Sequence, residues 1–104
     1  MSNEVRARDF QGYENRQNPG LGLPSEVVMA QGIDWPVHID AYLSSAAKFG
    51  ERYVALIYCD GSGVSENGMT VATPAVECVD VKMGFKLMRS AGGDHYVITS
   101  EQDT

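Results

Sequence analysis

The stretch from Val79 to Leu87 shows a clear alternation of apolar and polar side chains. Its apolar residues occupy every odd position: Val79, Val81, Met83, Phe85 and Leu87. A period of two residues is typical of a strand with one buried face and one wet face. We therefore expect one long strand over Val76 to Arg89 in an antiparallel, half-solvated sheet. Its parity changes between Cys78 and Val79, which predicts a β-bulge there.

Three further strands are expected around this one. Tyr53 to Cys59 is apolar on both faces, so it should be a central strand. Met69 to Thr73 follows Asn67-Gly68, a hairpin-turn signal, and Asp94 to Thr99 follows the glycine-rich turn at 91–93. Because the turns are short, the four strands should form an antiparallel meander.

Helical spacing of apolar residues predicts a main helix from Asp34 to Phe49. A shorter helix is expected over Ser25 to Gln31, with Ser25 as N-cap and Gly32 as its end. The stripe of the main helix should bury itself against the odd face of the long strand. The fold expected is an α+β two-layer sandwich, with one main and one short N-terminal helix packed on a four-stranded antiparallel β-meander. The stripe comprises Trp35, Ile39, Tyr42, Leu43, Ala46 and Phe49.

The 104 residues suffice for one domain. Residues 1–20 are polar and lack sustained periodicity, so we expect a flexible N-terminal arm followed by a single α+β domain over residues 21–104. Phe10 and Tyr13 are the large apolar residues of the arm and are candidates to dock on a partner. The first ten residues lack the apolar core of a signal peptide, and the longest apolar run, Tyr53 to Cys59, is too short to span a membrane. A cytoplasmic protein is therefore expected.

The net charge of −6 narrows the choice of partners. Charges balance in residues 1–20, so the acidic excess lies in the body of the chain. An acidic body repels phosphate backbones, which argues against direct nucleic-acid binding. It favours another protein with a basic surface, although such a charge also simply keeps a small protein soluble.

The chain has two cysteines, Cys59 and Cys78, and two histidines, His38 and His95. Two cysteines in predicted strands of a cytosolic protein are expected to be buried thiols rather than a disulfide. Nothing in the spacing of these four residues requires a metal. We therefore expect no metal and no cofactor, and histidines that are solvated or locally hydrogen-bonded.

The loop from Asp60 to Gly68 is rich in glycine and follows a buried strand. Such a loop can present backbone N–H groups to an anion, but it departs from the phosphate-loop, dinucleotide-loop, nucleophile-elbow and EF-hand patterns. Its polar residues Asp60, Ser62 and Glu66 are candidate binding residues, with a mobile connector as the plainer interpretation. Trp35 is either a core residue or a surface anchor for a partner.

These features favour a small, acidic, non-enzymatic interaction or regulatory module, such as an inhibitor or accessory protein of the phage or mobile-element type. Two alternatives stay open: a small-ligand-binding homodimer, and a small enzyme using Asp60, His38 or His95. One substantial helix cannot cover both faces of the sheet, so the arm, the segment Ser25–Gln31 or a second copy should cover the other. A second copy supplies the most area, so a homodimer is expected, through the second sheet face or an edge strand.

Overall fold

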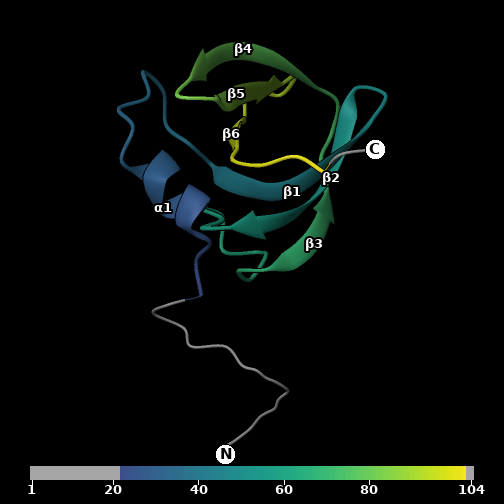
Figure 1. The fold of residues 1–104 in the computed structure, drawn as a ribbon. Helices are drawn as coiled ribbons and strands as arrows, with labels where there is room; N and C mark the ends of the chain where they lie inside the picture. Colours follow the sequence, from purple (N-terminus) through teal and green to yellow (C-terminus); the bar gives the residue numbers. More distant parts are fainter. Residues whose placement is uncertain (1–21, 103–104) are drawn as a thin grey trace, which may run out of the picture.

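The structure, a computed structural model, describes residues 22–102, which fold into a six-stranded mixed sheet with one short helix (Figure 1). The prediction of a main helix on a four-stranded antiparallel meander was therefore wrong. In chain order the elements are α1 (Ser25–Gln31), β1 (Ala41–Phe49), β2 (Arg52–Tyr58), β3 (Met69–Ala72), β4 (Val76–Lys82), β5 (Phe85–Ser90) and β6 (His95–Ile98).

The strands are ordered β3-β2-β1-β6-β5-β4 across the sheet. All neighbours are antiparallel except β1 and β6, whose parallel pairing joins two three-stranded meanders. The sheet curves strongly, like an open barrel (Figure 1). The connection from β3 to β4 runs beside the start of β2, because Thr73 N donates to Tyr53 O and Val76 N donates to Glu51 O, both at 2.8 Å.

The predicted main helix is an irregular segment over residues 34–40 followed by strand β1. A bulge explains why the pattern resembled a helix. Ser45 has a φ of 54°, and the pairing with β2 shifts register between Ser44 and Ala47. The bulge places the buried residues Leu43 and Ala46 three positions apart, which is the spacing of a helix rather than a strand.

The predicted long strand is a hairpin made of β4 and β5. Met83 and Gly84 form its turn with φ values of 53° and 83°, as a two-residue type I′ turn requires. The turn pairs Lys82 with Phe85 and Asp80 with Leu87, so between the bulge and the turn the even positions of β4 share a face with the odd positions of β5. Phe85 is accordingly buried, whereas the odd residues Val79, Val81 and Met83 are exposed, which corrects their prediction as core.

Elements governed by local signals were predicted well. The short helix has the expected bounds and ends at Gly32, although its N-cap is Pro24 and no side chain of the described residues caps it. The bulge expected at Val79 is confirmed, since Cys78 pairs with Met88 and Asp80 with Leu87.

Two apolar clusters lie on the two faces of the sheet, as the alternation along β1 shows. Leu43 belongs to the inner cluster and its neighbour Tyr42 packs against the outer one. Trp35 is buried in the outer cluster, whereas Phe49, expected in the same stripe, is 67% exposed. The inner cluster comprises Ala41, Leu43, Ala46, Tyr53, Ala55, Ile57, Met88 and Ile98, and the outer one Ala30, Trp35, Phe85, Leu87 and Val97.

Two expectations concern the N-terminal arm and the membrane. Residues 1–20, with Phe10 and Tyr13, lie outside the described residues. Within residues 22–102, no helix has the length and apolar character needed to cross a bilayer.

Candidate functional site

The candidate site lies where β1 and β6 begin and β2 ends. Because β1 and β6 are parallel, their starts lie side by side, and antiparallel β2 brings its end to the same place. Asp40 N donates to His95 O and His95 N donates to the Asp40 carboxylate, both at 2.8 Å. Gly61 N donates to Asp40 O at 2.8 Å. Asp40 thus fixes the glycine-rich loop to the sheet.

Asp60 organises that loop through its carboxylate. One oxygen accepts Ser62 N at 2.9 Å and Ser62 Oγ at 2.8 Å, and the other accepts Ser65 N at 2.9 Å. The Ser62 hydrogen bonds, followed by that of Ser65, hold the pKa of Asp60 below its ordinary value. Backbone N–H groups that could have received an external anion are directed at this resident carboxylate. The loop therefore presents negative charge, and Asp60 is ionised at neutral pH rather than ready to donate a proton.

A hollow of about 360 Å³ lies between this loop and the β3–β4 connection. We call it the acidic hollow. Its floor is apolar, its loop side carries Asp60 and two serines, and its opposite wall is formed by the end of β3 and the residues after it. The lining residues are Leu43, Ile57, Asp60, Ser62, Val64, Ser65, Val71, Ala72, Thr73, Pro74 and Tyr96.

Tyr96 lines the hollow, and the causes of its raised pKa show which charges act there. Burial raises the pKa of Tyr96 first, and the negative charges of Asp94, Asp40 and Asp60 raise it further. Within residues 22–102, the charged groups that act on Tyr96 are thus all carboxylates. His38 Nε2 lies 3.8 Å from the Asp40 carboxylate and is largely exposed.

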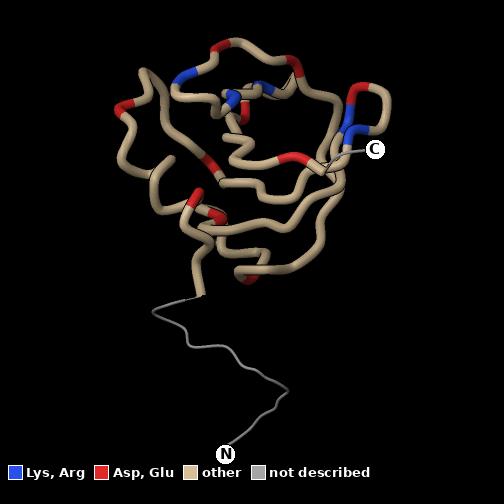
Figure 2. The backbone as a smooth tube through the Cα atoms, viewed as in Figure 1, with Lys and Arg blue, Asp and Glu red and all other residues tan. Residues whose placement is uncertain are grey.

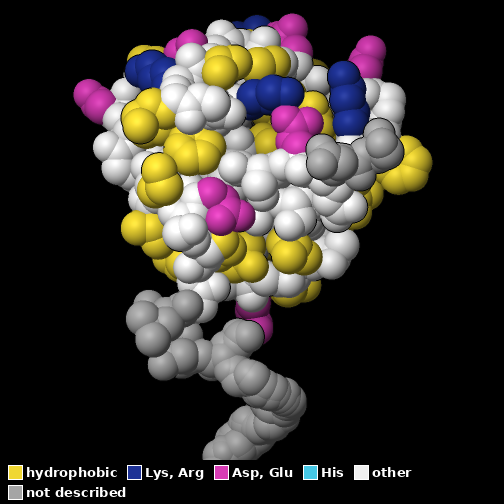
Figure 3. Space-filling model, in the orientation of Figure 1, with side chains coloured by type: hydrophobic (Ala, Val, Ile, Leu, Met, Phe, Trp, Pro, Cys, Tyr) yellow, Lys and Arg dark blue, Asp and Glu magenta, His cyan; other side chains and the backbone are white. Residues whose placement is uncertain are grey.

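The basic residues of the described chain lie in other segments. Lys48 and Arg52 flank the β1–β2 turn, and Lys82, Lys86 and Arg89 belong to the β4–β5 hairpin. Figure 2 shows these blue segments toward the top and right of the molecule, and on the face drawn in Figure 3 the Lys and Arg side chains are confined to the upper part. The acidic hollow is therefore not neutralised by these cations.

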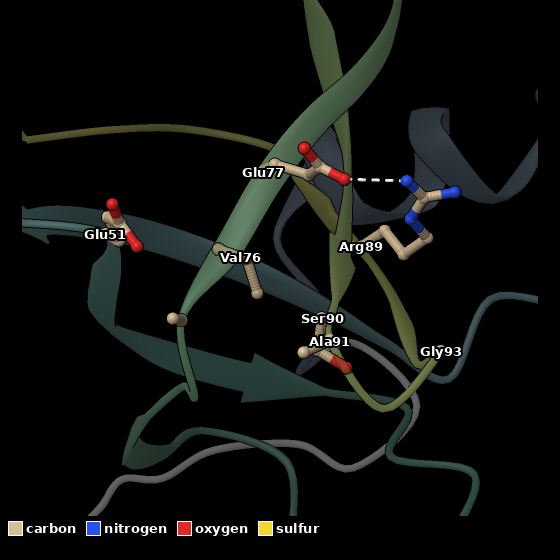
Figure 4. Close-up of a pocket in the computed structure, with 8 residues that line it drawn as sticks. Glu51, Val76, Glu77, Arg89, Ser90, Ala91 and Gly93 are labelled. Atoms are coloured by element: carbon tan, nitrogen blue, oxygen red, sulfur yellow. Dashed lines mark hydrogen bonds and ion pairs between the residues drawn. The ribbon is translucent and has the colours of Figure 1, made fainter.

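A second, wider hollow of about 760 Å³ lies beside the start of β4 (Figure 4). Among the described residues that line it, the one cation is Arg89, whose Nη2 lies 2.6 Å from Glu77 Oε2, while Glu51 lies on the opposite wall. Small residues of the β5–β6 turn form much of the remainder. A neighbouring hollow of about 240 Å³ shares Glu51, Val76 and Glu77 with it. This trough lacks the broad apolar floor of the acidic hollow, so it is the weaker candidate.

The structure brings two of the predicted binding residues together, since Asp60 and Ser62 both line the acidic hollow. Glu66 is exposed on the same loop but does not line the hollow. Trp35 does not line the hollow but belongs to the outer cluster, where it is 8% exposed and Lys82 Nζ lies 5.5 Å from the centre of its ring.

The cysteine prediction was wrong about burial, because Cys59 is half-buried and Cys78 is exposed; both are free thiols. In the part of the chain that the structure describes, no three His, Cys, Asp or Glu side chains are grouped so that they could hold a metal ion.

Sequence reasoning missed Asp40, Asp94 and Tyr96. These residues lie near Asp60 because β1 pairs in parallel with β6. That pairing brings together segments that are distant in the sequence, such as those of Asp40 and His95. The one local signal was the position of Asp94 directly after a glycine turn.

Comparisons with known proteins add no family or relative: no family model matches the chain, and neither the curated proteins nor the solved structures include a significant match.

Proposed function

We propose that this protein is a non-catalytic binding module that holds a basic segment of another protein in the acidic hollow. The observation that carries the proposal is the combination of an apolar floor with a rim on which the acting charges are carboxylates. An apolar side chain of the partner would enter the hollow, and a neighbouring Lys or Arg would meet the rim.

The floor supports the first half of this recognition. Leu43 and Ile57 are buried strand residues of the inner core, so the hollow has a preformed apolar base. Val71 and Tyr96 pack against the same cluster. A preformed site requires little ordering of the protein on binding, which favours affinity.

The rim supports the second half. Asp60, which lines the hollow, is held by three hydrogen bonds from its own loop. Asp40 is not a lining residue, but its charge acts on Tyr96 and its carboxylate accepts a hydrogen bond from His95 N, so both carboxylates are fixed before a ligand arrives. Charge-assisted hydrogen bonds from Lys or Arg to carboxylates are stronger than neutral ones. Complementary charge also raises the association rate and excludes acidic competitors.

Amide chemical-shift mapping with two capped tripeptides tests the proposal. Acetyl-Lys-Leu-Lys-amide should shift the amide resonances of Ser62, Ser65 and Tyr96, and should leave Ala91 of the wider trough unchanged. Acetyl-Glu-Leu-Glu-amide, which has the same central side chain, is the matched control and should shift none of them. Equal effects of both peptides, or shifts confined to the trough, would refute the proposal.

A small cationic ligand is a second candidate function, favoured by the volume of the hollow. About 360 Å³ falls within the roughly 300–1,000 Å³ typical of small-molecule sites. Titration with 2-phenylethylamine separates the two functions. If the protein binds this amine more tightly than it binds the basic tripeptide, the result supports a small ligand. If it binds the amine more weakly, the result supports a protein segment.

A further inference from the structure

Strand β4 forms one edge of the sheet and exposes apolar side chains there. Val79 is 41% exposed, Val81 54% and Met83, in the turn that follows, 78%. Figure 1 shows β4 arching along the outside of the sheet, and apolar surface is visible at the top of the molecule in Figure 3. An exposed, apolar edge is a template for pairing with another strand.

Hydrogen bonds identify which residues of β4 direct their main chain away from β5. Val76 N donates to Glu51 O and Val81 N donates to the Asp80 carboxylate, so neither amide is used in the ladder with β5. Main-chain direction alternates along an antiparallel strand, so Cys78 also faces outward. The bulge at Val79 adds one residue, which makes Val81 the next outward position. Beyond the part covered by Glu51, the free edge therefore offers Cys78 and Val81.

From this pattern we propose that β4 pairs antiparallel with β4 of a second copy, with Cys78 of each chain opposite Val81 of the other. In this two-fold register, Cys78 and Val81 of each strand both lie opposite a residue whose main chain also faces outward. If the two-fold axis passed through Cys78, only Cys78 would have such a partner, and if it passed through Val81, only Val81 would. The result is a continuous sheet across two copies.

Side chains agree with the same register. Cys78 and Val81 are opposite Met88 and Lys86 in the β5 ladder, which places both on one face of the sheet. Glu77 and Lys82 lie on the other face and would meet each other across the axis, twice in the dimer. Opposite charges in facing cross-strand positions are stabilising. The edge is thus complementary to itself in backbone and apolar surface. Glu77, which pairs with Arg89, and Lys82, which donates to Asp34 O, would add opposite charges to the pairing.

Asp80 opposes this pairing and makes the proposal testable. In the proposed register the two Asp80 residues flank the axis, each opposite Val79 of the other copy, so their like charges approach. The Asp80 carboxylate also occupies the Val81 N–H that the partner strand must bind. Asp80→Asn should therefore tighten the dimer by about twofold to fivefold, as expected for removal of an unfavourable cross-strand charge pair.

Cross-linking tests the register. Facing residues of a hydrogen-bonded antiparallel pair have Cα atoms about 5.5 Å apart, which a disulfide can bridge. The full chain carrying Cys59→Ser and Val81→Cys should give a covalent dimer on mild oxidation, through the native Cys78 and the introduced thiol of the other copy. Within one strand the two thiols are three residues apart at about 3.3 Å each, beyond disulfide reach. Lys82→Cys in the same background is the matched control, because that position faces Glu77 on the other side of the sheet, and it should form no covalent dimer on oxidation.

Sedimentation velocity over a hundredfold concentration range tests the association itself. The wild type should pass from monomer to dimer, and Val81→Pro, which removes an outward N–H without touching the β5 ladder, should remain monomeric while keeping the wild-type circular dichroism spectrum. A monomeric wild type and Asp80→Asn over the whole range would overturn the proposal. Equal cross-linking by the position-81 and position-82 variants would also overturn it. Binding of the edge by a different protein, with this chain remaining monomeric, would count equally against it.

Discussion

Replacing Leu43 with alanine tests whether residues 41–49 form a central strand. Leu43 is 1% exposed and pairs with Ile57 on one side and Ile98 on the other. The substitution removes three carbon atoms, or about 2.4 kcal/mol at about 0.8 kcal/mol per buried methylene. A residual cavity between two paired strands adds to this, so we expect a loss of about 3–4 kcal/mol, within the usual range for buried leucine.

Phe49→Ala is the matched control, because a helix over residues 34–49 would bury both residues in one stripe. Phe49 is 67% exposed at the end of β1, so its truncation should change the free energy of unfolding by less than about 0.5 kcal/mol. Urea unfolding followed by Trp35 fluorescence measures both values. A loss below about 1 kcal/mol for Leu43→Ala, or an equal loss for Phe49→Ala, would refute the strand assignment.

Three further predictions concern strain, pH and the loop. Ser45→Gly should raise stability by about 0.5–1 kcal/mol in thermal unfolding, because Ser45 has a φ of 54°; a destabilised variant would contradict this. The backbone N–H of Glu26 and then the hydroxyls of Ser44 and Ser100 lower the pKa of Glu26, so its contribution is present at neutral pH and lost as the pH falls through that lowered pKa. Glu26→Gln should therefore unfold more easily than the wild type at pH 7, by about 1 kcal/mol, with the difference vanishing in acid; a constant difference would show that the charge does not matter. Asp60→Asn should speed amide hydrogen exchange in its loop, since the charged acceptor is lost, and unchanged exchange would mean that the carboxylate does not hold the loop.

The parts of the fold that follow from local chemistry were predictable from the sequence. The helix over Ser25–Gln31 and the bulge at Val79 each depend on a few neighbouring residues. The type I′ hairpin turn expected at Asn67-Gly68 was wrong, since only Gly68 of this pair has a positive φ and residues 59–68 connect β2 to β3. Strand β1 was missed because the bulge at Ser45 interrupts its period of two. The β4–β5 turn was missed because the alternation of residue types continues through Met83-Gly84 while the chain reverses.

The candidate site was predictable only in part, for a related reason. Asp60 and Ser62 are marked by the glycines around them in the sequence. Asp40 and Tyr96 join them through the parallel pairing of β1 with β6, a contact between distant segments that no local pattern encodes. Non-local strand pairing therefore decided both the topology and the composition of the acidic hollow.

The affinity of the acidic hollow for a basic peptide, with and without its carboxylates, tests the central claim most directly. The triple variant Asp40→Asn, Asp60→Asn, Asp94→Asn keeps a side-chain oxygen acceptor at each position but removes the negative charges that act on Tyr96. Calorimetric titration with acetyl-Lys-Leu-Lys-amide should show binding to the wild type that weakens at least about tenfold in the folded triple variant, because each charged hydrogen bond contributes roughly 1.5–3 kcal/mol. Equal affinity for both proteins would contradict recognition of a basic segment by this hollow.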